Sequence, residues 1–416
     1  MKESARTLAL AALKRWREGT EFADKIVSET FSKSALGASD RAFALELFYG
    51  ALRNLTLLDF WIAQLRPAPV DSNSRDILRL GLYQILLIET AAHAAVFETV
   101  ELAPPRARGL INALLRRALR EKDGLTTLAG DLPLPVQFSE PEFLVEKWTQ
   151  QFGTESAVAL CRWNNQPAAV HARINPLKNS AAAFMQKYPG SVSLGERANF
   201  VDLPEPAAAL AKGDCYIQDP STALACELLQ PSPGETVLDA CAAPGGKSAY
   251  LAGMMANRGT LIAADRDQAR LDRLRGNLVR LGVANATIVW CNWLEPESIR
   301  AAAFQPQSCH KILLDAPCSN TGVMRRRVDV RWRLRPKEFA RMHAQQLAIL
   351  ENVAPLLKPG GSLVYSTCSL EPEENDEVVA AFVREHAAFC LTKREQNLPF
   401  RDGIDGAFAA RLELAA

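Results

Sequence analysis

Residues 236–248 read TVLDACAAPGGKS, and this stretch decides the fold of the C-terminal half of the chain. It is a short apolar run followed by a turn of small residues and by the beginning of a helix. Glycine at 245 and 246 lets backbone N–H groups approach a ligand closely at the positive end of that helix. We therefore expect an anionic or nucleotide-like ligand at this turn.

Spacing separates three interpretations of the turn. A phosphate-binding P-loop requires glycine at position 241, where a cysteine stands. A dinucleotide fingerprint requires G-x-G-x-x-G, but the turn contains the adjacent pair Gly245 and Gly246 instead. The remaining interpretation is the loop of a class I methyltransferase, which wraps the methionine part of S-adenosylmethionine.

From about residue 215, apolar runs alternate with stretches of helical periodicity, which predicts βαβ units and a doubly wound parallel sheet. The further runs are TLIAA (260–264), ATIVW (286–290), KILLDA (311–316) and SLVYST (362–367), and the helical stretches are 247–255, 268–281, 337–357 and 373–386. Asp265 directly follows the second run, where an acidic side chain reaches ribose hydroxyls in such folds. This position suits NAD and S-adenosylmethionine alike, and Asp265 could instead be the N-cap of the following helix.

Two cysteines, Cys318 and Cys368, follow the ends of the last two runs. Open α/β sheets bind ligands beyond the carboxyl ends of their strands, and neighbouring strands lie about 5 Å apart. Both sulfurs would therefore face one substrate if these strands are neighbours. A single cysteine is usually a small buried apolar side chain, but two at equivalent strand ends indicate a functional pair. A metal site is not favoured, because no histidine accompanies them.

Two thiols beside a methyl donor suit the chemistry of cytosine C5. This carbon is a poor nucleophile until a thiolate adds to C6 and creates an enamine. A second group must then remove the C5 proton so that the first thiol can leave. Asp315, three residues before Cys318, is placed to hydrogen-bond the base. We also expect positive charge or a helix end to lower the pKa of one thiol, although the residues alone do not say which thiol attacks.

Composition narrows the class of protein. The 416 residues predict two to three domains, and 48 basic against 47 acidic residues give no overall sign of a polyanionic partner. The nine cysteines are odd in number and form no C-x-x-C pair, which argues against disulfides and structural zinc and favours the cytoplasm. The apolar part of the N-terminal segment is too short for a secretory signal or a membrane span.

The rest of the chain divides by its texture. Residues 1–125 carry helical patterns, including one over 41–65, and predict an all-helical domain. Residues 126–140 contain Pro133 and Pro135 and resemble a linker. Residues 141–214 mix helical and strand-like pieces, which indicates a small α+β module before the sheet domain at 215–416.

Local basic clusters are the candidates for nucleic-acid contact. The helix at 109–122 carries Arg116 and Arg117, and a solvated helix face is the simpler explanation for it. The segment 325–341 holds eight basic residues against two acidic ones and begins with Arg325, Arg326 and Arg327. Because it follows Cys318 closely, we expect it to bind phosphates. Trp332 could stack on a base or be buried.

Three motifs resemble, in order and spacing, those of RNA 5-methylcytosine methyltransferases: DACAAPGGKS (239–248), LLDAPCSNTG (313–322) and VYSTCSLEPEEN (364–375). The segments at 39–61, 78–89, 91–103 and 109–119 resemble the NusB-like RNA-binding domain of the bacterial Sun/Fmu (RsmB-type) branch, which acts on small-subunit ribosomal RNA. The resemblance implies a class I, Rossmann-like methyltransferase domain preceded by a NusB-like helical domain and a small α+β module.

The resemblance also implies roles for individual residues. Cys368 would be the nucleophile and Cys318 would assist product release. The S-adenosylmethionine site would be formed by Cys241, Ala242, Ala243, Pro244, Gly245, Gly246, Lys247, Asp265, Asn292 and Asp315. Asn292 stands where this family usually has aspartate, so a charge on the cofactor side is lost.

The implied partner is 16S ribosomal RNA, naked or in an early assembly intermediate, bound by a monomer without metal or membrane. Two alternatives remain open at this point. The methyl acceptor could be transfer RNA or a protein side chain, or the chain could be a non-catalytic RNA-binding factor built on its NusB-like half. The two cysteines and the glycine turn argue against the second alternative.

Overall fold

The computed structural model describes residues 3–195, 197 and 199–416 and divides the chain into two compact units. Unit 1 comprises residues up to Pro167 together with Met324–Arg333, and unit 2 comprises Ala168–Val323 and Leu334–Ala416. The boundary differs from the predicted one at residue 125. Of the segment 141–214, the first two helices belong to unit 1, whereas the strands and the two later helices belong to unit 2.

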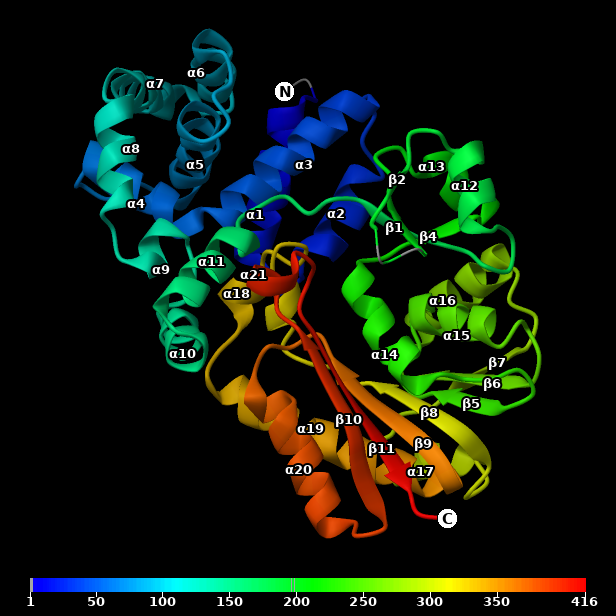
Figure 1. Cartoon of the computed structure of the whole chain (residues 1–416). Coiled ribbons are helices and arrows are strands. Elements are labelled where there is room, and N and C mark those ends of the chain that lie inside the picture. Colours follow the sequence, from blue (N-terminus) through cyan, green and yellow to red (C-terminus); the bar gives the residue numbers. More distant parts are fainter. Residues whose placement is uncertain (1–2, 196, 198) are drawn as a thin grey trace. The chain divides into compact units, whose positions relative to one another are not determined.

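Unit 1 is helical throughout its described residues (Figure 1). Its helices are α1 (Ala5–Glu18), α2 (Ala23–Phe31), α3 (Ala38–Arg53), α4 (Leu55–Leu65), α5 (Ser72–Leu86), α6 (Ala92–Val100), α7 (Pro105–Arg120), α8 (Lys122–Gly130), α9 (Leu134–Gln137), α10 (Glu142–Phe152), α11 (Thr154–Asn164) and α18 (Val330–Arg333). The helix predicted over 41–65 is two helices, because the backbone of Asn54 leaves the helical conformation. Residues 126–140, predicted as a linker, carry the end of α8 and α9.

Local chemistry explains how these helices begin and pack. Ser4 and Thr7 form a reciprocal capping box at the start of α1. Gly50 lets α3 approach α5, since a Cβ on it would lie 2.0 Å from the ring of Tyr83. Buried apolar side chains such as Phe48 and Trp61 fill the space between the helices. Burial of this kind supplies most of the stability of short helices.

Unit 2 contains two sheets. The smaller sheet is antiparallel, in the order β2-β3-β1-β4, and the larger is seven-stranded, in the order β10-β11-β9-β8-β5-β6-β7. The strands are β1 (His171–Ile174), β2 (Val192–Ser193), β3 (Phe200–Asp202), β4 (Cys215–Ile217), β5 (Thr236–Asp239), β6 (Thr260–Asp265), β7 (Ala286–Trp290), β8 (Cys309–Asp315), β9 (Leu357–Thr367), β10 (Phe389–Asn397) and β11 (Ala407–Leu414).

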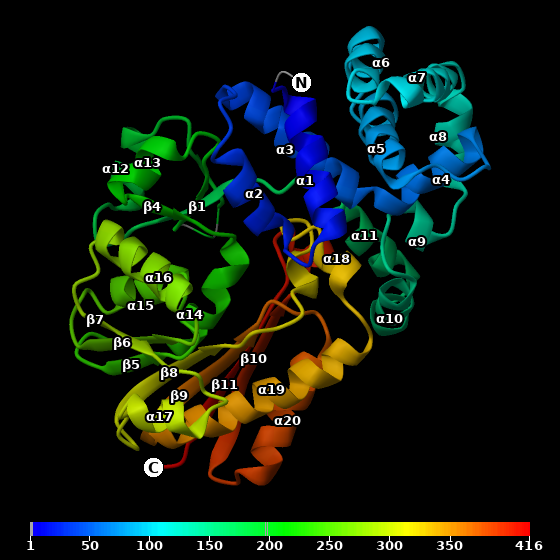
Figure 2. The ribbon, with the colours of Figure 1, turned by 180° about the vertical axis from the view of Figure 1, so that it is seen from behind.

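Helices cover both faces of the large sheet, as Figures 1 and 2 show. They are α14 (Ala223–Leu229), α15 (Gly246–Met254), α16 (Gln268–Leu281), α17 (Pro296–Ala301), α19 (Lys337–Val353) and α20 (Asp376–Glu385); α12 (Ala181–Lys187) and α13 (Ala207–Lys212) belong with the small sheet, and α21 (Pro399–Asp402) precedes β11. Strand residues alternate between the two faces. Leu314 packs on the side of α19 and α20, and Leu313 packs on the side of α14 and α15.

The order of the large sheet sets the place of the site. Strands β5 to β9 are parallel, and the chain proceeds from β5 in one direction through β6 and β7 and in the other through β8 and β9. Ligands bind beyond the carboxyl ends of strands at such a reversal. The structure confirms the predicted fold class of a helical N-terminal region, an α+β module and a Rossmann-like sheet. The antiparallel pair β10–β11 was not predicted.

Candidate active site

The two cysteines predicted to act together lie at the carboxyl ends of neighbouring strands. Strands β8 and β9 pair in parallel with Asp315 opposite Ser366, so the loops that follow them leave the sheet side by side. The Sγ atoms of Cys318 and Cys368 are 3.2 Å apart. Both side chains are partly exposed. The structure thus brings both sulfurs to one accessible place, as the strand order required.

A buried carboxylate ties the two cysteine loops together. Glu374 is fully buried and accepts hydrogen bonds from the backbone N–H of Ser319 (2.8 Å) and from the hydroxyl of Ser369 (2.9 Å). These serines directly follow Cys318 and Cys368. Glu374 lies in the motif VYSTCSLEPEEN, but no role was predicted for it; a carboxylate six residues after Cys368 was the available signal.

The environment of Cys318 keeps it protonated. Its hydrogen bond with Cys368, its burial and the nearby charge of Glu374 together raise the pKa of the Cys318 thiol well above the usual value. The expectation that positive charge would lower the pKa of one thiol therefore does not hold for this cysteine. At neutral pH the Cys318 thiol can donate its proton toward the sulfur of Cys368.

An ion pair lies beside the cysteines. The ammonium of Lys247 is 2.8 Å from Oδ2 of Asp315, and the hydroxyl of Ser366 donates to Oδ1 of the same carboxylate at 2.9 Å. Although burial opposes it, the charge and hydrogen bond of Asp315 raise the pKa of Lys247. The Lys247 and Asp315 side chains keep 18% and 32% of their surface exposed. Both charges are therefore fixed in direction and still within reach of a ligand.

The glycine turn runs from Cys241 to Lys247, and α15 begins at its end. Gly245 has a φ of +104°, and a Cβ on Gly246 would lie 2.7 Å from the ring of Tyr216. Internal packing therefore already requires both glycines, in addition to any approach of a ligand. Burial raises the pKa of Cys241, so this third thiol of the region remains neutral.

Asp265 ends β6 as predicted, and its buried carboxylate accepts hydrogen bonds from the backbone N–H groups of Asp267 (3.1 Å) and Ala243 (3.2 Å). It is not the N-cap of α16, because that role belongs to Asp267, whose side chain accepts from the N–H of Arg270. Asn292 lies beyond β7, where its amide donates to Glu295 at 2.6 Å. Asp265 thus joins the second strand end to the glycine turn.

Asp239, at the end of β5, is a site residue that sequence reasoning missed. It is fully buried, and its Oδ2 accepts a hydrogen bond from Ser248 at 2.6 Å. Its Oδ1 has no hydrogen-bond partner among the described residues. Burial raises the pKa of this carboxyl to about 7. The available signal was a charged residue ending an apolar run, the same signal that identified Asp265.

Comparison with known proteins decides the family. The chain is 34% identical to the "Probable ribosomal RNA small subunit methyltransferase B" of Bacillus subtilis (strain 168), over 97% of this chain and 94% of that protein. A family model described as 16S rRNA methyltransferase RsmB/F matches residues 226–413. The chain belongs to the RsmB/F family of ribosomal RNA small subunit methyltransferases.

Further comparisons cover the rest of this RsmB/F methyltransferase. The NusB family model matches residues 3–120, and the model of the RsmF/B-like ferredoxin-like domain matches residues 140–188. The relative from Synechocystis sp. (strain PCC 6803), also described as a probable ribosomal RNA small subunit methyltransferase B, is 35% identical over 92% of this chain and 90% of its own length.

Solved structures share the fold. The crystal structure of PH0851 matches with a TM-score of 0.78 at 24% identity and covers 99% of both chains. The structure of a methyltransferase homolog protein from Pyrococcus horikoshii has a TM-score of 0.59 at 28% identity, covering 68% of this chain and 97% of that one. The fold of this chain therefore matches that of PH0851 over the length of both units.

Arg173, on β1, is a second residue that the sequence analysis missed in this RsmB/F methyltransferase. Its buried guanidinium donates to the carbonyl of Gly246 (2.8 Å) and to the side chain of Gln218 (2.9 Å), and it stacks on the ring of Tyr250. Burial lowers its pKa to about 10. This cation fixes the first residue of α15 to the small sheet and so supports the glycine turn.

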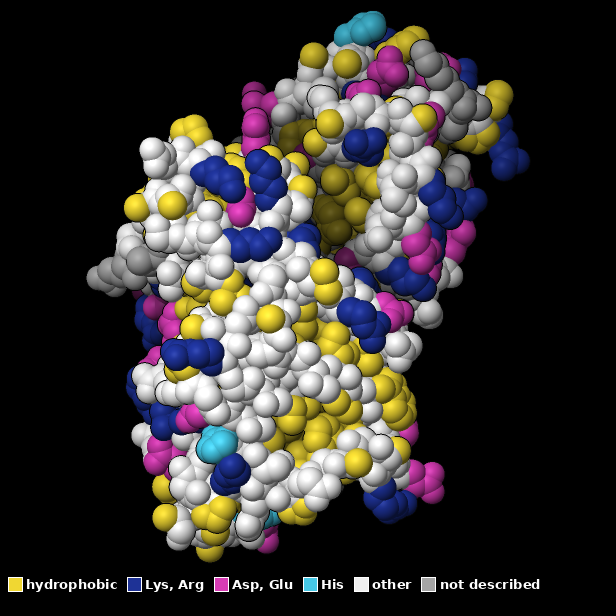
Figure 3. All heavy atoms as spheres, turned by 90° about the vertical axis from the view of Figure 1, so that its right-hand side faces the viewer, with side chains coloured by type: hydrophobic (Ala, Val, Ile, Leu, Met, Phe, Trp, Pro, Cys, Tyr) yellow, Lys and Arg dark blue, Asp and Glu magenta, His cyan; other side chains and the backbone are white. Residues whose placement is uncertain are grey.

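The predicted RNA-binding residues fall into two groups. On α7, Arg116 is exposed, and Arg117 forms an ion pair with Glu121. Arg326 is half-buried and Arg327 is exposed. On the face drawn in Figure 3, Lys and Arg side chains are scattered rather than gathered in one patch. This face therefore shows no single basic patch that would mark an RNA-binding surface.

Two arginines of the segment 325–341, which was expected to bind phosphates, are buried. Arg325 is 5% exposed and lies over the ring of Trp163, with 3.8 Å from its guanidinium carbon to the ring centroid. Arg331 is fully buried and pairs with Glu140 at 3.0 Å. Trp332 donates from its indole N–H to the carbonyl of Leu52, which agrees with the buried alternative. These side chains hold the segment in unit 1.

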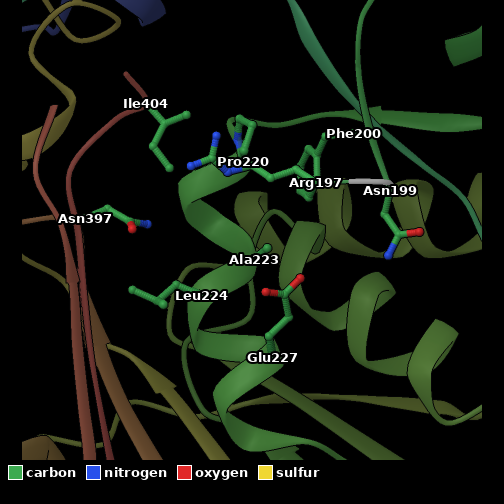
Figure 4. A pocket seen from close by; sticks show the side chains of 9 residues that line it. All are labelled: Arg197, Asn199, Phe200, Pro220, Ala223, Leu224, Glu227, Asn397 and Ile404. Carbon is green, nitrogen blue, oxygen red and sulfur yellow. The ribbon is translucent and has the colours of Figure 1, made fainter. Parts of the chain in front are cut away.

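Other features of the described residues lie apart from this site. Unit 2 has a cavity of about 240 Å³ whose walls include Glu227 of α14 and Asn397 of β10 (Figure 4), and no predicted site residue lines it.

Within the described part of the chain, no cluster of three or more His, Cys, Asp and Glu side chains could hold a metal ion. No described helix is long and apolar enough to cross a membrane.

Proposed function

We propose that this RsmB/F methyltransferase transfers a methyl group from S-adenosylmethionine to C5 of a cytosine in 16S ribosomal RNA, with Cys368 as the nucleophile. The observation that carries the proposal is the 3.2 Å separation of two partly exposed sulfurs at adjacent strand ends. The ion pair of Lys247 and Asp315 beside them supplies the fixed charges that such a reaction needs.

The residues fit S-adenosylmethionine. The donor would be held by the turn from Cys241 to Lys247, by Asp265 and Asn292, and by Asp315. The buried Oδ1 of Asp239, which has no donor among the described residues, can accept a hydrogen bond from a bound ligand. Bound S-adenosylmethionine would supply an electrophilic methyl group on a sulfonium.

Cys368 activates the base. Its thiolate adds to C6 of the cytosine, forming a carbon–sulfur bond and making C5 electron-rich. The Cys318 thiol, protonated because its pKa is raised, donates a hydrogen bond that stabilises this thiolate. Asp315, held in direction by Lys247 and Ser366, accepts a hydrogen bond from the edge of the base.

Cys318 completes the reaction after methyl transfer. Once Cys368 is a neutral thioether, its hydrogen bond and charge no longer raise the pKa of Cys318, so the partly exposed Cys318 gives its proton to water. The Cys318 thiolate then acts as the base that removes the C5 proton. The electrons of that C–H bond reform the 5,6 double bond and expel Cys368 as a thiolate. Both cysteines are then regenerated, and one proton has been released to solution for each methyl group transferred to C5.

The test of substrate and position uses the complete chain with labelled S-adenosylmethionine and separated RNA classes. Small-subunit RNA is supplied naked and as an early assembly intermediate. We expect label in 16S RNA and, by bisulfite mapping, a single protected cytosine. Label confined to transfer RNA or protein would overturn the ribosomal substrate, and label in 16S RNA without bisulfite protection would overturn the cytosine C5 chemistry.

A further inference from the structure

One side chain contacts both cysteine loops. Asn320 lies two residues beyond Cys318, in the loop that follows β8. Its amide nitrogen donates to the carbonyl oxygen of Cys318 at 2.8 Å. Its amide oxygen accepts from the Sγ of Cys368 at 3.3 Å. The loop after β8 therefore reaches the sulfur at the end of β9 through this residue.

These contacts fix how the amide is oriented. A carbonyl oxygen accepts hydrogen bonds and does not donate them, so the Asn320 group that faces the Cys318 carbonyl must be the NH₂. The amide oxygen then faces Cys368 and can accept only the proton of its S–H group. The sulfur of Cys318 contacts Cys368 at 3.2 Å. Two directed contacts thus locate the sulfur of Cys368.

The backbone at this position favours asparagine. Asn320 has a φ of +62°, in the left-handed region that asparagine and glycine adopt most readily. Next along the loop, Gly322 packs so closely that a Cβ on it would lie 2.7 Å from the carbonyl oxygen of Cys368. The loop is therefore held against Cys368 by its backbone, and the Asn320 amide is presented to the sulfur.

We propose that Asn320 is a positioning residue that holds the Cys368 thiol, before it ionises, in the orientation from which its sulfur attacks C6. The proposal rests on the proposed function, because it gives Asn320 a role only if Cys368 is the nucleophile. Reacting atoms must lie about 3–3.5 Å apart in line, and a displacement of about 1 Å can cost on the order of 100-fold in rate. A neutral amide cannot take the thiol proton, so that proton passes to water when Cys368 ionises.

The variant that tests this is Asn320→Gly, which removes both hydrogen bonds and tolerates a positive φ. Asn257→Gly is its matched control. Asn257 also has a positive φ, of 55°, and its amide also bridges two chain segments, through Gly282 and Ala284, in the turn that precedes β6. Asn320→Asp is the second variant, because aspartate also tolerates this backbone but cannot donate to the Cys318 carbonyl.

Two measurements separate the inference from the proposed function. The first is the rate at which Cys368 forms a covalent adduct with RNA containing 5-fluorocytosine, whose fluorine cannot be removed as a proton. We expect Asn320→Gly to slow this rate and kcat by about 10-fold or more, with the KM for RNA unchanged. Asn320→Asp should be slowed likewise, and Asn257→Gly should match the wild type.

The second measurement is alkylation of Cys368 by iodoacetamide in the protein without RNA, read by peptide mass spectrometry. Loss of the amide contact should speed alkylation by about 3-fold in Asn320→Gly and leave Asn257→Gly unchanged. A wild type that forms no adduct would overturn the proposed function, whatever the alkylation rates. A wild type that forms the adduct, with both Asn320 variants as fast as it is, would overturn the role of Asn320 alone.

Discussion

Two pairs of a cation and a carboxylate, one in each unit, have similar geometry and opposite surroundings. In unit 1, Arg331 and Glu140 are 3.0 Å apart, and both side chains are 0% exposed. In unit 2, Lys247 and Asp315 are 2.8 Å apart, with 18% and 32% of the side chains exposed. Distance alone does not distinguish them. Exposure distinguishes them. The fully buried pair, Arg331 and Glu140, is called the closed pair here and can only stabilise the fold. The partly exposed pair, Lys247 and Asp315, is called the open pair and can also contact a ligand.

In the closed pair, burial disfavours the charged form of both side chains. Burial raises the pKa of Glu140 and lowers that of Arg331, even though each faces its partner. The guanidinium is held further by the carbonyl of Asn164 (3.1 Å) and the side chain of Asn165 (2.8 Å). In the open pair, by contrast, the pKa of Lys247 is raised, so the charged form is favoured. Charge that is partly solvated remains available for chemistry.

Breaking the closed pair should give the largest change. Arg331→Leu leaves Glu140 buried without its cation, and removing one partner of a buried pair costs about 3–5 kcal/mol. We expect the free energy of unfolding of unit 1, measured by denaturant titration, to fall by this amount. The control Arg327→Leu changes an exposed neighbour on the same segment and should shift stability by less than about 0.5 kcal/mol. Equal small shifts in both variants would show that the pair does not hold the segment.

Asp239 is a buried carboxylate that forms no ion pair among the residues that the structure describes. Asp239 has a pKa raised by burial to about 7, so its protonated form fits the fold better. The protonated Asp239 carboxyl contributes stability that is fully present below pH 3.8, the pKa of aspartate in the unfolded chain. This contribution is lost as the pH rises through about 7, the pKa in the folded protein. Asp239→Asn should therefore gain stability relative to the wild type between pH 4 and pH 8, by up to about 4 kcal/mol.

The measurement for Asp239 is the urea unfolding midpoint at several pH values, without added S-adenosylmethionine. The control Asp272→Asn changes a carboxylate that is 61% exposed, and it should shift the unfolding midpoint only slightly. A constant difference between Asp239→Asn and the wild type across this range would contradict the raised pKa.

Breaking the open pair should affect activity rather than stability. Lys247→Met removes the ammonium that holds Asp315, and we expect kcat/KM for methylation to fall by about 100-fold, or about 3 kcal/mol. Stability should change by less than about 1 kcal/mol, because the pair is partly solvated. Lys393→Met, on an exposed strand position, is the control and should keep full activity. A loss of stability that matches the loss of activity would make Lys247 a fold residue like Arg331.

The smallest effect concerns the exposed remainder of the basic segment. Arg327→Gln should weaken RNA binding slightly and reduce the slope of log affinity against log salt by about one unit. Arg384→Gln, exposed on α20, should leave the slope unchanged. If the slope is the same in wild type and Arg327→Gln, Arg327 does not contact phosphate.

The contrast also explains what could be predicted from the sequence. Cys318, Cys368 and Asp265 were found because each ends or follows an apolar run, and parallel strands place such positions on one edge. Asp239 also ends an apolar run, but it was missed because the glycine turn that follows it accounted for the ligand site without it. Strand β10 was missed because most of its residues are polar and exposed, so it lacks a clear apolar alternation.

The burial of side chains in the basic segment could not be predicted from the sequence. A local excess of arginine predicts an exposed face, because most charged side chains are solvated. Burial of Arg331 depends on Glu140, which lies 191 positions earlier in the chain. Val328 is likewise buried in the core of unit 1. No local pattern reports a partner that folding brings from so far away.

Trapping of a covalent adduct distinguishes the attacking cysteine, Cys368, from Cys318, which releases the product. Cys318→Ala and Cys368→Ala are each incubated with 16S RNA and S-adenosylmethionine and analysed on a denaturing gel. We expect a protein–RNA adduct that survives denaturation in Cys318→Ala, since the C5 proton stays in place, and none in Cys368→Ala. An adduct in Cys368→Ala and none in Cys318→Ala would contradict the assignment of the two sulfurs.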